Sequence, residues 1–99
     1  MYPFASEETD RLFDAVLGLK TREECYAFFD DLCTIKEIRD MSLRFEGAIM
    51  LEKGDNYNQI SEKIGLSPAT ISRISRCLNY GSGGYRAAIE RIAKENEDK

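Results

Sequence analysis

Apolar residues recur at intervals of three and four positions along most of the chain, which is the spacing of one face of an α-helix. Ser6 is a residue type that caps helix N-termini and Gly18 is one that ends helices, so a first helix is predicted between them. Its apolar face would consist of Leu12, Phe13, Val16 and Leu17. No segment has the apolar-polar alternation of a half-buried strand, and the chain is therefore predicted to be all-α.

Two capping boxes mark the starts of the next two helices. In these boxes a threonine, Thr21 or Thr34, is followed three positions later by Glu24 or Glu37. The helix after Thr34 is expected to run towards Gly54, over roughly 20 residues or 30 Å. A helix of this length is more than one small compact monomer can cover, so it indicates a dimer. Its apolar face is expected to consist of Ile38, Met41, Phe45, Ile49 and Leu51.

The second half of the chain has the layout of a helix-turn-helix. A short helix is expected to begin at Asp55 or Asn56, Gly65 supplies a turn in which φ is positive, and Ser67-Pro68 starts the next helix. The first of these helices is expected to end at Ile64 and the second near Asn79-Tyr80. A glycine-rich break, Gly81–Gly84, then precedes a last helix, whose apolar residues are Tyr85, Ala88, Ile89 and Ile92.

The outer faces of these two helices have the residue types of a DNA-binding surface. The helices would pack through Ile60, Ile64, Ile71 and Ile74. Small and polar side chains let a helix enter a major groove, arginine reads guanine or holds phosphate, and a helix start offers N–H groups to phosphate. On the second helix these roles fall to Ser67, Ala69, Thr70, Ser72, Arg73 and Arg76. On the first helix, contacts to the DNA backbone are expected from Asn58, Gln59 and Ser61.

The distribution of charge along the chain supports DNA binding more than the net charge does. The formal net charge is −4. Residues 58–91 nevertheless contain five basic and two acidic residues, and residues 67–80 contain two arginines and no acid. A basic segment within an acidic protein is consistent with a localised phosphate-binding face. A helical hairpin with a solvated polar face would share the spacing, but the carboxylate-free outer face favours DNA binding.

Composition excludes several other classes of protein. The length of 99 residues predicts a single domain, 1–99, with the helix-turn-helix at 56–80. Histidine is absent, which removes the commonest general base and zinc ligand, so an enzyme is not expected. Three cysteines without a C-x-x-C motif predict reduced, mostly buried thiols, and no metal site. Neither a signal peptide nor a membrane-spanning run is apparent, which predicts a cytoplasmic protein.

One segment of the helix-turn-helix has a distinctive sequence. It reads Ala69-Thr70-Ile71-Ser72-Arg73, and it follows Lys53-Gly54-Asp55 and Ile64-Gly65. In this combination the chain resembles the Trp repressor superfamily, and within it the YerC/YecD-type branch, over about residues 10–92. The resemblance implies a six-helix protomer and an intertwined homodimer. Its two helix-turn-helix elements, one from each protomer, would enter neighbouring major grooves about 34 Å apart.

The same resemblance implies a corepressor site between the long helix and the second helix of the helix-turn-helix. Arg44 and Arg73 match two arginines that flank the corepressor, and Thr34 matches a residue at its amino end; an arginine fork suits a carboxylate. Ile74 stands where the family has a glycine beside the ring, and Cys77 where a serine helps to anchor the amine. Ile74 is expected to fill the ring space. This argues against tryptophan and leaves another small-molecule corepressor, or none, open.

A structural role is the alternative for the two arginines. Arg44 and Arg73 would then form interhelical ion pairs, with Glu46 or Glu62 as partners, and Arg73 would also contact phosphate. The aromatic side chains are expected to form the core and the dimer interface rather than a base-stacking platform. They are Phe4, Phe13, Tyr26, Phe28, Phe29 and Phe45.

Together these features predict a bacterial-type transcriptional regulator, expected to be a repressor. It would bind double-stranded DNA sequence-specifically as a homodimer, with no cofactor required. The alternative is a protein-interaction module on the same scaffold, which the net acidic charge favours. Salt dependence discriminates between the two, because phosphate contacts weaken steeply as salt rises.

Overall fold

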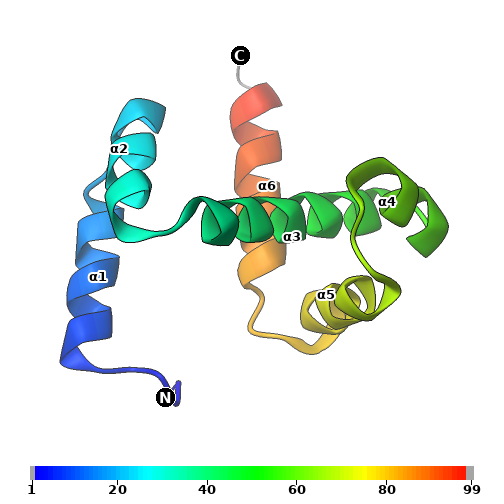
Figure 1. Cartoon of the computed structure of the whole chain (residues 1–99), viewed down its shortest axis with the longest axis horizontal. Coiled ribbons are helices and arrows are strands. Elements are labelled where there is room, and N and C mark those ends of the chain that lie inside the picture. Colours follow the sequence, from blue (N-terminus) through cyan, green and yellow to red (C-terminus); the bar gives the residue numbers. More distant parts are fainter. Residues whose placement is uncertain (1, 98–99) are drawn as a thin grey trace. The chain divides into compact units, whose positions relative to one another are not determined.

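Helices form all the regular secondary structure of residues 2–97, the part of the chain that the computed structural model describes (Figure 1). In order they are α1 (Glu7–Leu17), α2 (Arg22–Leu32), α3 (Ile35–Lys53), α4 (Tyr57–Ile64), α5 (Pro68–Tyr80) and α6 (Gly84–Glu97). The all-α prediction is confirmed. The chain divides into two compact units, residues 1–38 and 39–99, with the boundary inside α3.

Capping side chains begin the helices at the predicted residues. Ser6 caps α1, and its hydroxyl accepts a hydrogen bond from the N–H of Thr9. At the start of α3 the capping box is complete, because the N–H of Thr34 donates to the Glu37 carboxylate at 2.8 Å and the N–H of Glu37 donates to the Thr34 hydroxyl at 3.1 Å. At the start of α2, Thr21 accepts from the N–H of Glu24, and the Thr21 hydroxyl donates to the Glu24 carboxylate.

The start of α6 differs slightly from the prediction. The glycine-rich break was expected to include Gly84, but α6 begins at that residue. The break therefore consists of residues 81–83, where Gly83 has a φ of +85°. A glycine has no Cβ, so Gly84 can enter the first turn of a helix as readily as it can precede one.

The first unit, residues 2–38 of the described chain, has no buried side chain in α1 or α2. Of the aromatic residues predicted to form the core and the dimer interface, Phe4, Phe13 and Tyr26 are 62%, 49% and 73% exposed in the single chain, so they do not belong to its core. Their place in a dimer interface stays a prediction. Phe28 and Phe29 are half-buried and meet edge to face, with ring centroids 5.5 Å apart. Two helices of 11 residues cannot enclose side chains from all sides, so this unit presents its apolar surface outward.

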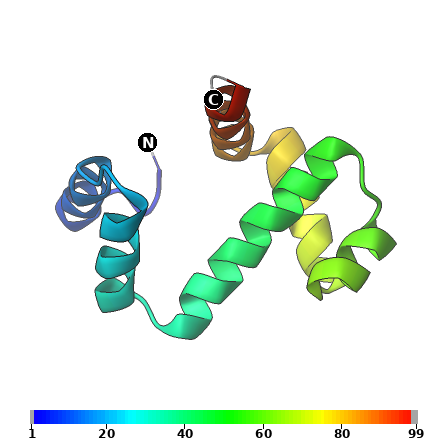
Figure 2. The same ribbon diagram turned by 90° about the horizontal axis from the view of Figure 1, so that it is seen from above.

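The second unit holds the buried core. Its members come from α3, α4 and α5, and α6 adds the partly buried Tyr85 and Ile89. Figures 1 and 2 show α4 and α5 beside the C-terminal part of α3, where these side chains meet. The buried hydrophobic residues are Ala48, Met50, Ile60, Ile71, Ile74 and Leu78.

The buried face of α3 is not the predicted one. Gly47, Ala48 and Met50 are buried, whereas Met41 is 40% exposed. Small residues let α4 and α5 approach the helix axis closely, which the apolar periodicity alone does not reveal.

The cysteine prediction also needs correction. Cys25 and Cys33 are half-buried, but Cys77 is exposed. Cys77 lies on α5 one residue before the buried Leu78, so helical periodicity turns it away from the core. Within residues 2–97, no helix combines the length and apolarity needed to cross a membrane.

Candidate nucleic-acid interface

The turn between α4 and α5 has the predicted geometry. Gly65 ends α4 in the left-handed region, with φ of +73° and ψ of 16°, and its N–H donates to the carbonyl of Ser61 at 2.9 Å. A residue without a Cβ adopts this conformation at little cost. Leu66 then packs against both core clusters, which fixes the short connection between the two helices.

The start of α4 is held by a capping box that involves one candidate DNA contact. The N–H of Asn56 donates to Oε1 of Gln59 at 2.7 Å, and the N–H of Gln59 donates to Oδ1 of Asn56 at 2.9 Å. Of the two predicted starting residues, Asn56 is therefore the cap. The Gln59 side-chain oxygen is occupied by this cap, so its amide NH₂ group is what it can offer to a phosphate.

The start of α5 presents polar groups in a fixed arrangement. Ser67 is the N-cap and Pro68 follows in the first turn, as predicted. The Ser67 hydroxyl accepts from the N–H of Thr70 at 3.2 Å and donates to the Thr70 hydroxyl at 3.0 Å. The Thr70 hydroxyl is thus engaged as an acceptor, and its own hydrogen is left to donate to a base edge or a phosphate.

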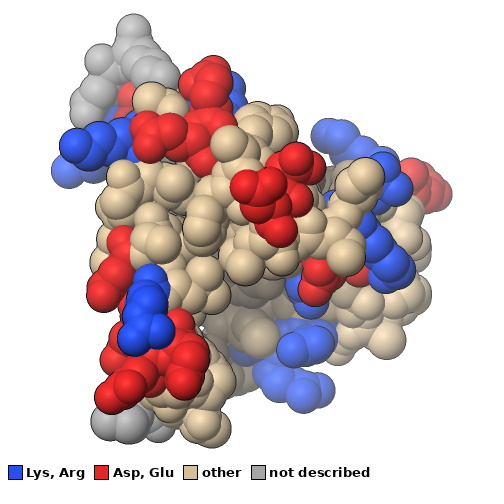
Figure 3. Space-filling view, turned by 60° about the vertical axis from the view of Figure 1, so that its left-hand side comes forward, with Lys and Arg blue, Asp and Glu red and all other residues tan. Residues whose placement is uncertain are grey.

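The two faces of α5 differ sharply in character. Ile71, Ile74 and Leu78 are buried against α3 and α4, and Thr70 is half-buried at the edge of that face. On the face that Figure 3 draws, basic and acidic side chains lie next to one another at several places. The solvent-exposed candidates on this helix and its cap are Ser67, Ala69, Ser72, Arg73 and Arg76.

The candidate DNA contacts on α4 differ in exposure, and the residues around them differ in charge. Asn58 and Gln59 are exposed, whereas Ser61 is half-buried. The exposed side chains on α4 also include Glu62 and Lys63, one of each charge. The assignment of α4 to contacts with the DNA backbone stays a prediction, as does the reading role of α5.

A cavity of about 190 Å³ lies between α3, α5 and α6, within the second unit. It brings together three of the four candidate effector residues, because Arg44, Arg73 and Cys77 all line it. Its wall is completed by Thr70, Ile74 and Tyr85. Cavities of about 150 Å³ hold a benzene-sized molecule, so this one has room for a small ligand.

Ile74 leaves this cavity open. A Cβ added to Gly47 would lie 3.3 Å from Cδ1 of Ile74 and 3.0 Å from Cδ1 of Leu66, so the end of the Ile74 side chain packs where Gly47 has no side chain. Ile74 thus lines the cavity without closing it, and the expectation that it fills the space of a tryptophan ring stays a prediction. Gly47 on α3 makes room for a larger residue on α5.

The fourth effector candidate has a different local role. Thr34 belongs to the first unit, where both its N–H and its hydroxyl bond to Glu37 in the capping box of α3. The hydrogen bond from the Thr34 backbone N–H, and secondarily the bond with its side chain, lower the pKa of Glu37. Thr34 is accordingly a helix cap in the single chain.

The alternative role of the arginines as ion-pair partners finds no counterpart in the described chain. Within residues 2–97, neither Arg44 nor Arg73 is paired with Glu46 or Glu62. Arg44 is half-buried and Arg73 is exposed, and both residues line the cavity. Two positive charges beside one cavity make it suited to an anion.

The sequence alone did not identify two residues that shape the cavity between α3 and α5. Tyr85 lines the cavity and stacks on Phe45, with ring centroids 6.4 Å apart and planes at 25°. Gly47 sets the spacing between α3 and α5. The signal for Gly47 is a glycine inside a strongly predicted helix, where it costs stability relative to alanine.

Known proteins match this arrangement over most of its length. The family model described as Trp repressor protein matches residues 7–93. YerC, an uncharacterized protein of Bacillus subtilis (strain 168), is 53% identical over 91 residues, which cover 92% of this chain and 86% of that protein.

Two solved structures match as well. A crystal structure of a protein from Staphylococcus aureus, proposed there to be a Trp repressor, has a TM-score of 0.86 and 45% identity, and the match covers 90% of this chain and 89% of the other. A TrpR-like protein from Eubacterium eligens ATCC 27750 also has a TM-score of 0.86, with 49% identity over 89% of this chain and 91% of the other.

Proposed function

Because the chain belongs to the Trp repressor family, we propose that it is a cytoplasmic transcriptional regulator that binds double-stranded DNA sequence-specifically as a homodimer. It acts as a repressor and works by binding, not catalysis. The observation that carries this proposal is α5 itself, whose exposed face has small, polar and basic side chains and no carboxylate.

Each part of α5 has a distinct role in this mechanism. Its buried isoleucines hold it on α3 and α4, so that its outer face can enter a major groove. Ala69, Thr70, Ser72 and Arg73 read bases directly or through water. Arg76, together with the cap Ser67 and the polar residues of α4, contacts the phosphate backbone and positions the helix.

The exposed apolar surface of the first unit supports the homodimer. Many of its large hydrophobic side chains are exposed in the single chain, which is unusual for a stable monomer in water. A second copy would bury them and would bring two helix-turn-helix elements onto one duplex. The side chains concerned are Tyr2, Phe4, Phe13, Leu17, Tyr26, Leu32 and Ile35.

Selection of bound sequences from a random duplex library tests the proposal. The purified protein, without added ligand and at moderate salt, is expected to enrich a palindromic site, since a twofold-symmetric dimer reads two half-sites. Affinity for that site is expected to fall steeply between about 50 and 200 mM salt. Absence of enrichment, with or without a pool of small metabolites, would contradict the proposal and favour a protein-interaction module.

A second candidate function concerns regulation through the cavity of Arg44 and Arg73. Two arginines that form no ion pair within residues 2–97 line about 190 Å³ of space, which suits a small ligand with a carboxylate that would fix α5 against α3. Benzoate is a suitable probe because it joins a ring of that size to a carboxylate. Millimolar benzoate is expected to raise the melting temperature of the protein and of an Arg91→Met control, which removes the same charge from an exposed residue of α6 that does not line the cavity, but not that of an Arg44→Met variant. Equal shifts in all three proteins, or none, would contradict a ligand role for this cavity.

A further inference from the structure

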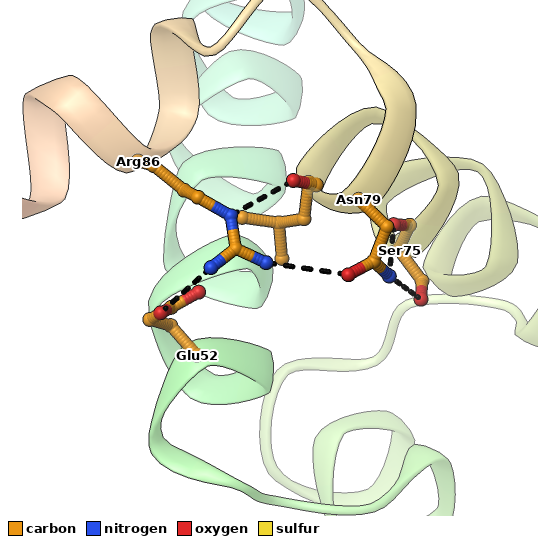
Figure 4. Close-up of polar contacts among 5 residues, drawn as sticks. Glu52, Ser75, Asn79 and Arg86 are labelled. Atoms are coloured by element: carbon orange, nitrogen blue, oxygen red, sulfur yellow. Dashed lines mark hydrogen bonds and ion pairs between the residues drawn. The ribbon is translucent and has the colours of Figure 1, made fainter.

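Arg86 joins three helices of the second unit through one side chain. It lies in the first turn of α6, and its Nε donates to the backbone carbonyl of Leu78 at 2.9 Å. Its two terminal nitrogens donate to Oδ1 of Asn79 at 3.2 Å and to Oε1 of Glu52 at 3.3 Å. Figure 4 shows the guanidinium between the end of α5 and the end of α3.

The acceptor on Leu78 is a group that α5 itself leaves unsatisfied. The carbonyls of the last helical turn have no N–H partner within their own helix. The N–H of Gly81 donates to the carbonyl of Cys77, and Arg86 donates to the carbonyl of Leu78. A positive charge is also favourable at this negative end of the helix dipole. Arg86 is therefore the C-terminal cap of α5, supplied by another helix.

Asn79 extends the contact along α5. Its Nδ2 donates to the carbonyl of Ser75 at 2.9 Å, while its Oδ1 accepts from Arg86. Both ends of the amide are therefore engaged, and the guanidinium is bonded to two successive residues of α5. On the other side, Glu52 belongs to the last turn of α3. The network ties the end of one helix to the end of the other.

This network is better suited to fixing the orientation of α5 than to stabilising the folded protein. The side chains of Arg86 and Glu52 are 46% and 37% exposed, and ion pairs with that exposure contribute little to the free energy of unfolding. The apolar contacts of Leu78 with its neighbours hold α5 down but are not directional. Hydrogen bonds restrict both distance and angle, and a planar guanidinium restricts them at several acceptors together.

We propose that Arg86 is a positioning residue for DNA recognition, which fixes the orientation of α5 relative to the second-unit part of α3. The inference rests on the proposed function. Thr70 is eight residues from Leu78, or about 12 Å along the helix. A tilt of about 10° at the capped end would therefore move Thr70 by about 2 Å, more than the tolerance of about 0.5 Å for a working binding site. Loss of Arg86 is thus expected to impair reading without unfolding the protein.

The test compares affinities for the selected duplex and for a scrambled duplex of equal length. Arg86→Gln is expected to lower the ratio of these affinities at least fivefold. Arg91→Gln is the matched control, because it removes the same charge from an exposed side chain of α6 that has no hydrogen bond or ion pair in the described chain. That variant is expected to weaken both duplexes alike and to leave the ratio unchanged.

Two conservative variants separate the hydrogen-bond geometry from the charge. Glu52→Gln keeps an oxygen acceptor and is expected to preserve the ratio within twofold. Arg86→Lys keeps the charge but cannot reach three acceptors, so it is expected to lower the ratio as Arg86→Gln does. Full recovery of the ratio in the lysine variant would overturn the positioning role. So would a ratio for Arg86→Gln equal to that for Arg91→Gln.

Residual dipolar couplings give a readout that does not depend on DNA. The N–H vectors of residues 68–80 are expected to rotate relative to those of residues 39–53 in Arg86→Gln, with melting temperature little changed. Unchanged relative orientation would overturn the inference even if DNA binding falls. If the wild-type protein selects no duplex, the proposed function and this role in recognition fail together. If the wild type selects a duplex but the variants behave alike, only the inference fails.

Discussion

Gly47 and Ile74 form a close contact that sets the distance between α3 and α5. A Cβ on Gly47 would approach Cδ1 of Ile74 to 3.3 Å, which is closer than most Cβ contacts, so the end of the isoleucine packs tightly beside the glycine. Ile74 is 2% exposed and also forms part of the wall of the cavity beside Arg44. This one contact explains how a large residue on α5 and an open cavity coexist.

Shortening Ile74 is expected to destabilise the protein in steps. Ile74→Val should cost about 0.5–1.5 kcal/mol and Ile74→Ala about 2–5 kcal/mol, since each removes buried methyl groups and leaves a larger cavity. Urea unfolding at fixed protein concentration measures both values. An alanine variant no less stable than the valine variant would show that the neighbours collapse into the space and that the contact with Gly47 is not close.

Two glycines beside α6 offer a matched pair of substitutions. A Cβ at Gly81 would lie 2.4 Å from the backbone carbonyl oxygen of Cys77, whereas a Cβ at Gly84 meets nothing within 4 Å. Gly81→Ala is therefore expected to lower stability by more than about 1 kcal/mol, because backbone atoms must move. Gly84→Ala is expected to raise it by up to about 1 kcal/mol, since alanine is a better helix former.

Thermal unfolding of the two alanine variants, followed by circular dichroism, distinguishes these outcomes. The wild type is the reference, and all three proteins are compared at one concentration because a dimer's melting temperature depends on it. Equal effects of the two substitutions would mean that residues 81–83 adjust freely and do not fix the end of α5.

Thr70 and Arg76 are expected to differ in what they contribute to DNA binding. Thr70→Ala should relax sequence preference at one position of each half-site, because the lost hydroxyl can no longer donate to a base edge. Arg76→Ala should weaken all duplexes alike and reduce the slope of log affinity against log salt by about one per lost phosphate contact. Fluorescence anisotropy with the selected site and single-base variants measures both effects. If neither substitution changes affinity, the reading face lies elsewhere.

The capping box of α3 is expected to make stability depend on pH in the acid range. The Thr34 N–H and hydroxyl lower the pKa of Glu37, so the folded state favours the ionised carboxylate. Its contribution to stability is present above the pKa of the unfolded chain, about 4.3, and is lost as pH falls through the lower folded value.

A carbon-detected titration of the Glu37 carboxyl measures that pKa directly. Glu37→Gln is the control, because glutamine can accept the same bond without titrating. The difference in stability between the two proteins is expected to shrink as pH falls below about 4. A Glu37 midpoint at or above that of an unstructured glutamate would refute the effect of Thr34.

The sequence by itself determined the helices, their caps and the turn. Ser6, Thr34, Asn56 and Ser67 act on N–H groups three residues away, and Gly65 needs only its own freedom of φ. These are local interactions, so the order of residue types along the chain specifies them. The carboxylate-free face of α5 follows for the same reason, from a period of 3.6 residues within one helix.

Only the tertiary structure decided which surfaces those helices bring together. Gly47 meets Ile74 27 positions later in the chain, and Glu52 meets Arg86 34 positions later, so neither contact has a local signature. The aromatic residues of the first unit had the periodicity of a core but lie exposed in the single chain. Periodicity records which side of a helix is apolar, whereas burial depends on how closely another helix can approach that side, and this is set by packing between residues distant in sequence.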